Sequence, residues 1–175
     1  MSQLLDRAAI LRFLEEVAAE LPVGAAEEVV VVGGSMLALT DLRSGTRDVD
    51  AAGELSQQLR GAAAVVAERH DLAPGWLSSS ASAFVPYGYV DVVDPSPVLS
   101  ATTLTVFTAT ADAVFVMKLF AGRPQDHDDL VALWPLCRFA SPQAAADACN
   151  RAYDFIGQPD VHLARYVEQI AAEAG

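Results

Sequence analysis

Four consecutive valines at residues 29–32 are the feature of this sequence that most restricts its fold. A short, continuous β-branched run is typical of a strand that is buried on both faces of a sheet. Gly33 and Gly34 interrupt the run, and Ser35 follows them with a hydroxyl that can cap a helix. The sequence therefore predicts a buried strand, a glycine turn and a helix that continues to about Asp41.

Two kinds of pattern alternate along the rest of the chain. Helical spacing of apolar residues, together with capping, glycine and proline signals, marks the expected helices. They cover residues 4–20, 55–69, 111–122, 126–134, 142–155 and 160–173. β-Branched or alternating sequence marks the expected strands. These cover residues 28–32, 46–52 and 103–109, with short strands and a loop within 76–95.

The order of these elements predicts an α+β fold. Strands in the first two-thirds and helices at the end favour a small mixed sheet covered by helices, with a C-terminal helical part. The length of 175 residues suits one domain. We therefore predict a single domain over residues 1–175. In it, residues 1–110 form a sheet-containing core with an N-terminal helix, and residues 111–175 form the helical part.

Composition limits the partners and the location of the chain. A net charge of −12 disfavours broad binding to nucleic acid, because phosphate contacts need clustered basic residues. The longest apolar runs are far short of the about 18 residues that a membrane span needs, so we expect no membrane partner. The N-terminal helix carries acidic side chains, unlike a signal peptide, and the two cysteines lack metal-ligand spacing. We therefore expect a cytoplasmic protein with reduced thiols.

Two aspartates, Asp48 and Asp50, lie on the strand expected after the glycine turn. Alternate side chains of a strand share a face, so both carboxylates point one way and Val49 points toward the core. Two neighbouring carboxylates repel each other, and a divalent cation removes that repulsion. Mg²⁺ is usually bound by one or two carboxylates together with substrate phosphates. The spacing therefore predicts a Mg²⁺–triphosphate site, and the alternative is a solvent-facing pair at the end of a strand.

The glycine turn adds a candidate phosphate site beside these aspartates. Gly33 and Gly34 let the backbone approach a ligand closely, and Ser35 offers a hydroxyl where free N–H groups favour phosphate. Thr46 shares the face of the two aspartates. We predict that Gly33, Gly34, Ser35 and Thr46 bind a nucleotide. The alternative is a plain strand-to-helix turn with a serine cap.

This first segment resembles the nucleotidyltransferase superfamily of polymerase-β-like folds. In that superfamily a glycine-glycine or glycine-serine turn opens a helix, and an Asp-x-Asp on the next strand binds metal. The matching residues are Gly33, Gly34 and Ser35 with Asp48 and Asp50, preceded by Arg43 and by Thr46. The resemblance implies Mg²⁺-dependent transfer of a nucleoside monophosphate (NMP) from a nucleoside triphosphate (NTP).

A second informative segment runs over residues 111–133. Lys118 lies on an apolar helical face, so it needs an anionic partner, such as a triphosphate or an aspartate, or a route to solvent. Arg123 ends that helix, and Asp126 and Asp129 lie one turn apart on the next. Each aspartate could orient Lys118, complete the metal site or act as a base. The alternative is a lysine that snorkels to solvent at a domain edge.

The second segment resembles a stretch of nucleotidyltransferase-like toxins of the abortive-infection type and of their uncharacterised relatives. The matching residues are Met117, Lys118, Leu119, Ala121, Arg123, Asp126, Asp129 and Leu130. The resemblance implies catalytic roles for Lys118, Asp126 and Asp129 and a nucleotide-binding role for Arg123. It also implies tRNA or protein acceptors, although the acidity of the chain shifts the expectation toward a protein or a small molecule.

One departure from the superfamily leaves two functional hypotheses. Active members often carry a third carboxylate on a later strand, and the strand at 103–109 has none; Asp91 and Asp94 are the candidates. The first hypothesis is a Mg²⁺-dependent nucleotidyltransferase acting on an unknown acceptor, as a toxin–antitoxin component with a cognate partner protein or as a homodimer. The second is a catalytically degraded fold that serves as a binding or interaction module. A third reading is an α+β domain whose Asp-Val-Asp is incidental.

Overall fold

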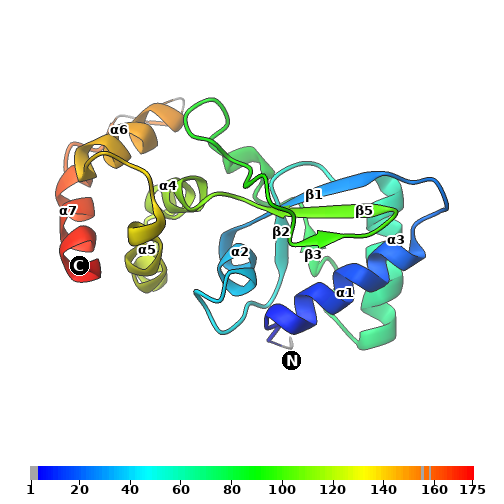
Figure 1. Cartoon of the computed structure of the whole chain (residues 1–175). Helices are drawn as coiled ribbons and strands as arrows, with labels where there is room; N and C mark the ends of the chain where they lie inside the picture. The colour runs from blue at the N-terminus through cyan, green and yellow to red at the C-terminus, as the bar shows by residue number, and fades with distance from the viewer. Residues whose placement is uncertain (1–3, 155, 158) are drawn as a thin grey trace. The chain divides into compact units, whose positions relative to one another are not determined.

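The computed structural model describes residues 4–154, 156–157 and 159–175, and the chain divides into two compact units (Figure 1). The sheet unit comprises Met1–Ala83 and Val93–Ala109. The helical unit comprises Phe84–Val92 and Thr110–Gly175. Each unit has its own packed interior, and each is described by itself below.

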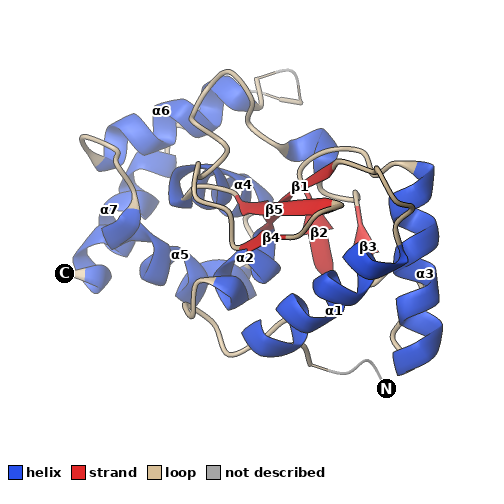
Figure 2. Cartoon of the chain, turned by 45° about the vertical axis from the view of Figure 1, so that its right-hand side comes forward, coloured by secondary structure: helices blue, strands red, loops and turns tan. Residues whose placement is uncertain are grey.

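The sheet unit contains a five-stranded mixed sheet, drawn in red in Figure 2. Its strands are β1 (Glu27–Val32), β2 (Val49–Ala51), β3 (Leu77–Ser78), β4 (Leu99–Ser100) and β5 (Leu104–Thr108), in the spatial order β3-β2-β1-β5-β4. β1 is parallel to β5 and antiparallel to β2, while β3 is parallel to β2 and β4 is antiparallel to β5. The predicted α+β fold with a small mixed sheet is confirmed.

The valine run forms the central strand of this sheet. Val31 and Val32 are 0% exposed and Val29 is 3% exposed, as expected for a strand with neighbours on both edges and covered faces. β1 pairs with β5 along nearly its whole length, from Glu27 opposite Leu104 to Val31 opposite Thr108. The sheet therefore holds the end of β1, where the glycine turn begins, in a fixed place.

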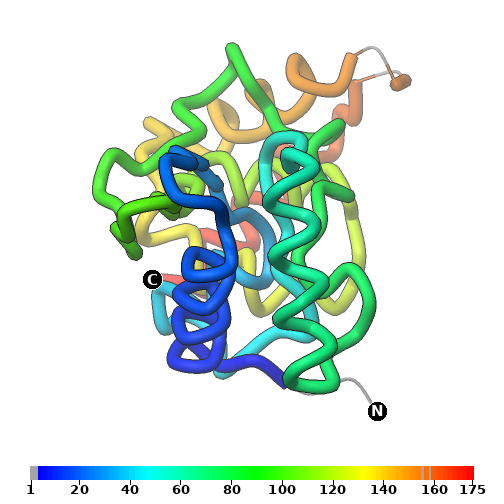
Figure 3. Tube along the Cα trace, turned by 90° about the vertical axis from the view of Figure 1, so that its right-hand side faces the viewer, coloured from blue at the N-terminus to red at the C-terminus, as the bar shows by residue number. Residues whose placement is uncertain are grey.

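Two helices supply most of the hydrophobic cover of the sheet unit. Figure 3 shows α1 (Arg7–Glu20) and α3 (Gln57–His70) lying side by side. Asp6 and Ser56 cap them by accepting hydrogen bonds from backbone N–H groups of their first turns. Trp76, which is 2% exposed, packs edge-on to an aromatic ring of α1 and donates from Nε1 to the Ala63 carbonyl.

Helix α2 (Gly33–Leu39) starts earlier than the sequence predicts. Its N-cap is Val32, no side chain caps it, and it ends before Asp41. Gly33 has a φ of +62° and makes the turn itself, so the helix begins at the glycine pair instead of after it. The prediction that Ser35 caps this helix is therefore wrong, because Ser35 already lies inside it.

The helical unit is built from α4 (Ala111–Ala121), α5 (His127–Leu133), α6 (Pro142–Ala152) and α7 (Leu163–Ala174). Short 3-10 turns, η2 (Pro124–Asp126) and η3 (Trp134–Leu136), flank α5, and a further one, η1 (Ser82–Phe84), precedes β4 in the chain. These helices confirm the predicted C-terminal helical part. The predicted end of the helix at residue 155 lies outside the described residues.

The interior of the helical unit is aromatic and aliphatic. Phe115 of α4 is 0% exposed and packs with Trp134 and Phe139 at ring-centroid distances of 5.5 and 6.1 Å. Gly122 ends α4 in the left-handed conformation, with φ +59°, as the glycine signal predicts. Across the described residues, the chain contains no helix with the length and apolarity needed to cross a bilayer.

Candidate functional site

The Asp-Val-Asp segment lies directly beside the glycine turn in the sheet unit. β2 runs antiparallel to β1, and the register places Asp50 opposite Val32, the last residue before the turn. Val49 and Ala51 are 0% and 1% exposed, whereas Asp50 is half-buried and Asp48 is exposed. The predicted alternation is confirmed, because the apolar side chains enter the core and the carboxylates remain on the other face.

Each carboxylate accepts a hydrogen bond from a nearby hydroxyl. Thr46 Oγ1 donates to Asp48 Oδ1 at 3.3 Å, and Ser78 Oγ donates to Asp50 Oδ1 at 3.1 Å. Both distances exceed the usual O–H···O range, so these bonds orient the carboxylates without strong pairing. Carboxylate oxygens are also the ligand type that Mg²⁺ prefers.

The backbone of the glycine turn lies against the same carboxylates. A Cβ at Gly33 would lie 3.8 Å from Asp50 Oδ2. A Cβ at Gly34 would lie 3.2 Å from both Arg43 Nη1 and Thr46 Oγ1. Glycine thus keeps this space clear of side-chain atoms, and it brings the start of α2 to the aspartates and to a guanidinium group.

Ser35 is part of the turn, but its hydroxyl already has two partners. The side chain is 1% exposed, its Oγ donates to the Val32 carbonyl at 2.8 Å, and it accepts from the Asp50 N–H at 3.3 Å. The hydroxyl therefore holds the glycine turn against β2 and sets the position of Asp50. A phosphate-binding role for Ser35 stays a prediction.

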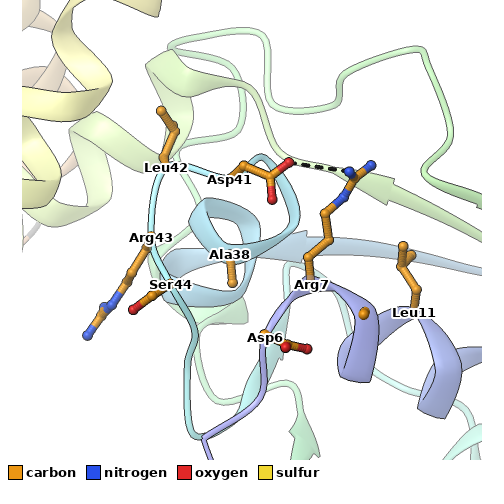
Figure 4. Close-up of a pocket in the computed structure, with 9 residues that line it drawn as sticks. Asp6, Arg7, Leu11, Ala38, Asp41, Leu42, Arg43 and Ser44 are labelled. Atoms are coloured by element: carbon orange, nitrogen blue, oxygen red, sulfur yellow. Dashed lines mark hydrogen bonds and ion pairs between the residues drawn. The ribbon is translucent and has the colours of Figure 1, made fainter.

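A pocket of about 790 Å³ in the sheet unit is lined by the start of α1, by the end of α2 and by the loop after α2. Figure 4 shows Arg7 of α1 paired with Asp41 of the loop after α2, at 3.3 Å, while Arg43 extends away from that pair. Arg43 both lines this pocket and approaches Gly34, so it connects the pocket to the turn. The remaining lining residues include the aliphatic side chains of Leu11 and Leu42.

Two residues of this site, Arg43 and Ser78, were not predicted as site residues from the sequence. Arg43 appears in the sequence only as a flanking basic residue, and its approach to Gly34 depends on the fold of the loop after α2. Ser78 sits in a serine-rich stretch with no clear pattern. Its contact with Asp50 arises because β3 pairs with β2 in a parallel register that places the two residues opposite each other.

The donor set of the sheet-unit site fits Mg²⁺. Asp50 lies beside the glycine turn and Asp48 shares its strand face, and carboxylates next to a phosphate-binding turn are the combination that Mg²⁺ sites on nucleotides use. Within the described ranges, no group of three or more His, Cys, Asp or Glu side chains is arranged to hold a metal ion. Asp94 accepts the Ser96 N–H at 2.9 Å, so it begins a turn, and Asp91 is an exposed residue of the helical unit.

The second group of predicted residues forms a buried ion cluster within the helical unit. Lys118 Nζ of α4 lies 2.7 Å from Asp126 Oδ1 and 2.8 Å from Asp129 Oδ2, and the lysine side chain is 5% exposed. Arg123 Nε adds a contact of 2.7 Å to Asp126 Oδ2 from a side chain that is 57% exposed. Lys118 thus has two anionic partners, Asp126 in η2 and Asp129 in α5. The η2 turn between α4 and α5 brings both of them back to α4.

The electrostatics of this cluster favour ionised groups. Burial alone would raise the pKa of Asp126, but its hydrogen bonds and charge interactions with Lys118 and Arg123 outweigh burial and lower the pKa. The carboxylate therefore stays charged and holds Lys118 in place. The structure brings together Lys118, Arg123, Asp126 and Asp129 in one unit, and Gly33, Gly34, Ser35, Thr46, Asp48 and Asp50 in the other.

Comparison with known proteins adds a family to this geometry. Residues 9–134 match a family described as a nucleotidyltransferase of unknown function (DUF6036). No curated protein and no solved structure matches the chain significantly. The matched range contains the glycine turn, the aspartate strand and the Lys118 cluster, and it covers well over half of the chain. The chain therefore belongs to this family of nucleotidyltransferases of unknown function.

Proposed function

We propose that this chain is a Mg²⁺-dependent nucleotidyltransferase that moves an NMP group from an NTP to an acceptor and releases pyrophosphate. The observation that carries the proposal is the approach of the glycine turn to Asp50, where a Cβ at Gly33 would lie 3.8 Å from Oδ2. Phosphates bound at the turn would lie beside Asp50, whose carboxylate is of the ligand type that Mg²⁺ prefers. Membership of a nucleotidyltransferase family supports the same chemistry.

Each residue of the sheet-unit site has a definite part in this proposal. Asp48 and Asp50 would hold Mg²⁺, oriented by the hydroxyls of Thr46 and Ser78. The metal, when bound, supplies positive charge that stabilises the phosphates in the transition state. The backbone N–H groups that follow Gly33 would donate to the phosphates, since N–H groups at the start of a helix favour negative charge.

In the reaction, an acceptor oxygen or nitrogen attacks the α-phosphorus of the NTP. The bond between the α-phosphorus and the oxygen that bridges to the β-phosphate breaks, and pyrophosphate leaves. We assign to Arg43, whose guanidinium approaches Gly34, the neutralisation of charge that collects on the leaving group. RNA, a protein and a small molecule all stay candidates for the acceptor.

The predicted roles of the helical-unit residues in catalysis stay predictions. The ammonium of Lys118 has two carboxylate partners, and Asp126 is shared between Lys118 and Arg123. These contacts support a structural role for the cluster, in which Asp126 and Asp129 fix Lys118. Arg123 is the most exposed cation of the cluster and is the one best able to contact a nucleotide.

Thermal stability with each NTP, with and without Mg²⁺, tests the proposal. Wild type should show a Mg²⁺-dependent rise of the melting temperature, because a ligand at about 100 times its Kd stabilises a fold by about 2.7 kcal/mol. The double variant Asp48→Asn/Asp50→Asn should lose the shift. Asp71→Asn is the matched control, since this exposed aspartate has φ +52°, a backbone that asparagine adopts readily. No shift with any NTP would overturn the proposal.

A second candidate function is a nucleotide-binding module that does not turn over. It is favoured by the finding that, in the described part of the chain, no third carboxylate joins Asp48 and Asp50 in a metal cluster. Pyrophosphate release in the presence of RNA, protein and small-molecule acceptors separates the two candidates. Binding without release supports the module. Co-purification of a bound protein, or of a homodimer, then tests the proposed place in a toxin–antitoxin pair.

A further inference from the structure

A hydroxyl, an imidazole and a carboxylate form a continuous hydrogen-bonded chain in the helical unit. Tyr166 Oη of α7 lies 3.0 Å from Nδ1 of His127, the first residue of α5. His127 Nε2 lies 2.7 Å from Glu173 Oε2, two turns further along α7. The three side chains are outside the sheet-unit site and outside the Lys118 ion cluster.

The carboxylate end of this chain fixes the direction of its hydrogen bonds. Hydrogen bonds from Gln169 and then His127 lower the pKa of Glu173, so its carboxylate is ionised and can only accept. His127 therefore carries its proton on Nε2 when the ring is neutral. Nδ1 is then the acceptor for the Tyr166 hydroxyl. This is the tautomer in which an imidazole can take a proton from a hydroxyl nucleophile.

Tyr166 also lines a pocket of the helical unit, and the residue is half-buried, not sealed in the core. The pocket has a volume of about 460 Å³, and such a volume is typical of small-molecule sites. Its walls include Phe120 and Tyr153, whose rings are stacked at 3.9 Å, and the amide side chain of Asn150. The two rings stack on each other and the Asn150 amide is bonded to the Asp160 backbone, so the pocket gives access to Tyr166 and is not assigned a ligand of its own.

Tyr166 needs a neighbouring proton acceptor to react as a nucleophile, because its surroundings favour the protonated phenol. Burial, then the charges of Glu173 and Asp126, raise the pKa of the phenol, so it is protonated at neutral pH. A protonated phenol becomes a good nucleophile when a neighbouring group removes its proton during the reaction. His127 is in hydrogen-bond contact with that oxygen.

We propose that Tyr166 is a nucleotidylylation site of this protein, with His127 as the base that takes the phenolic proton. The proposal rests on the proposed nucleotidyltransferase function, which supplies the NMP group. Tyr166 Oη forms a bond to the α-phosphorus of an NTP, and the bond from that phosphorus to the departing pyrophosphate breaks. The phenolic proton moves to His127 Nδ1, while Nε2–H stays hydrogen-bonded to Glu173.

The other tyrosines lack this arrangement. The chain has four tyrosines. The Tyr153 hydroxyl donates to the Phe84 carbonyl at 2.6 Å. Tyr87 and Tyr89 are exposed, and within the described residues neither has a histidine in contact with its hydroxyl. The acceptor class that follows is a phenolic hydroxyl of a protein.

The full chain, incubated with each NTP labelled at the α-phosphate and with Mg²⁺, tests this proposal. Peptide mass spectrometry of the wild type should find the NMP group on Tyr166. Tyr166→Phe should lose the label, and the matched control Tyr87→Phe should keep it. His127→Gln should slow labelling about 100-fold, since general-base catalysis contributes about 10²–10⁴-fold. Label on another residue, or an unchanged rate in His127→Gln, would overturn the proposal.

Two further measurements separate this inference from the function on which it rests. Tyr166→Phe should keep the wild-type, Mg²⁺-dependent thermal shift with NTP, because Tyr166 is not part of the sheet-unit site. A wild type that shows the shift but carries no label overturns the tyrosine proposal alone, whereas loss of both overturns the two together. A mixture of Tyr166→Phe as enzyme with Asp48→Asn/Asp50→Asn as acceptor shows whether one copy labels another.

Discussion

The two aspartate pairs of this chain differ in burial and in the groups that contact them. In the sheet unit, Asp48 is exposed and Asp50 is half-buried, and they accept from hydroxyls at 3.3 and 3.1 Å. In the helical unit, Asp126 and Asp129 are buried and contact one ammonium group at 2.7 and 2.8 Å. The spacing of each pair suggested a functional site when read from the sequence alone.

This difference shows that paired aspartates can form either a binding site or a structural network, depending on their burial and their partners. A buried carboxylate whose charge is matched by a cation at short distance has little to gain from a ligand. A carboxylate pair on a partly exposed strand face can accept a divalent cation as a further partner, which relieves the repulsion between the two carboxylates. The first pair should therefore matter for binding, and the second should matter for stability.

The largest expected effect is the loss of the buried cation. Lys118→Met should lower the free energy of unfolding of the helical unit by about 3–5 kcal/mol, because two buried carboxylates lose their partner. Arg123→Met is the matched control, since it removes an exposed cation from the same Asp126 and should cost less than about 1 kcal/mol. Urea unfolding with hydrogen-exchange mass spectrometry resolves the two units. Equal losses in both variants would contradict the contrast.

Acid should also lower the free energy of unfolding of the helical unit through the same cluster, by less than Lys118→Met does. Protonation of Asp126 leaves the contact between Lys118 and Asp129 in place. The pKa of Asp126 is lowered in the folded state, so its contribution is present above the unfolded value of about 3.9 and is lost as the pH falls through the folded pKa.

The free energy of unfolding, measured between about pH 5 and pH 2, checks this prediction. Asp126→Asn should flatten the acid loss. Asp128→Asn, which changes an exposed neighbour, should keep the wild-type profile. An acid profile that is the same in Asp126→Asn and in wild type would remove the cluster from the explanation.

The glycine turn should show an intermediate cost. Gly33→Ala places a Cβ on a residue with φ +62°, which costs about 1–2 kcal/mol for an L-residue, and it should also weaken Mg²⁺-dependent NTP binding. Gly53→Ala is the control, because an added Cβ there meets nothing within 4 Å. Thermal unfolding with and without NTP measures both effects. A Gly33→Ala protein as stable as the Gly53→Ala protein would refute the strain argument.

Local sequence patterns predicted the helices and strands of both units well, but they did not predict which side chains meet. The valine run and the alternation of Asp48, Val49 and Asp50 depend on neighbouring residues, and both were confirmed. The contact between Asp50 and Ser78 depends on strand register across 28 residues of sequence, which no local pattern encodes. Ser35 failed as a helix cap because the positive φ of Gly33 starts the helix earlier.

The same limit applied to the Lys118 cluster. Helical spacing placed Asp126 and Asp129 on one face and predicted that Lys118 needs an anionic partner. It did not show that the three residues meet, because that contact depends on η2, which turns the chain between α4 and α5. Sequence therefore identified the charged residues, while the turn geometry decided what neutralises them.

The smallest expected change in stability is at the sheet-unit aspartates. This prediction distinguishes most clearly between the two aspartate pairs, because it separates a role in binding from a role in folding. Asp48→Asn should change the free energy of unfolding by no more than about 0.5 kcal/mol, because the side chain is exposed and its hydrogen bond from Thr46 is long. The same variant should lose most of its Mg²⁺-dependent affinity for NTP, measured by titration calorimetry. Asp129→Asn should show the reverse, with a clear loss of stability and NTP binding retained by the sheet unit. A destabilised Asp48→Asn that still binds NTP would assign the pair a structural role, because a carboxylate needed only as a metal ligand contributes to binding and not to folding.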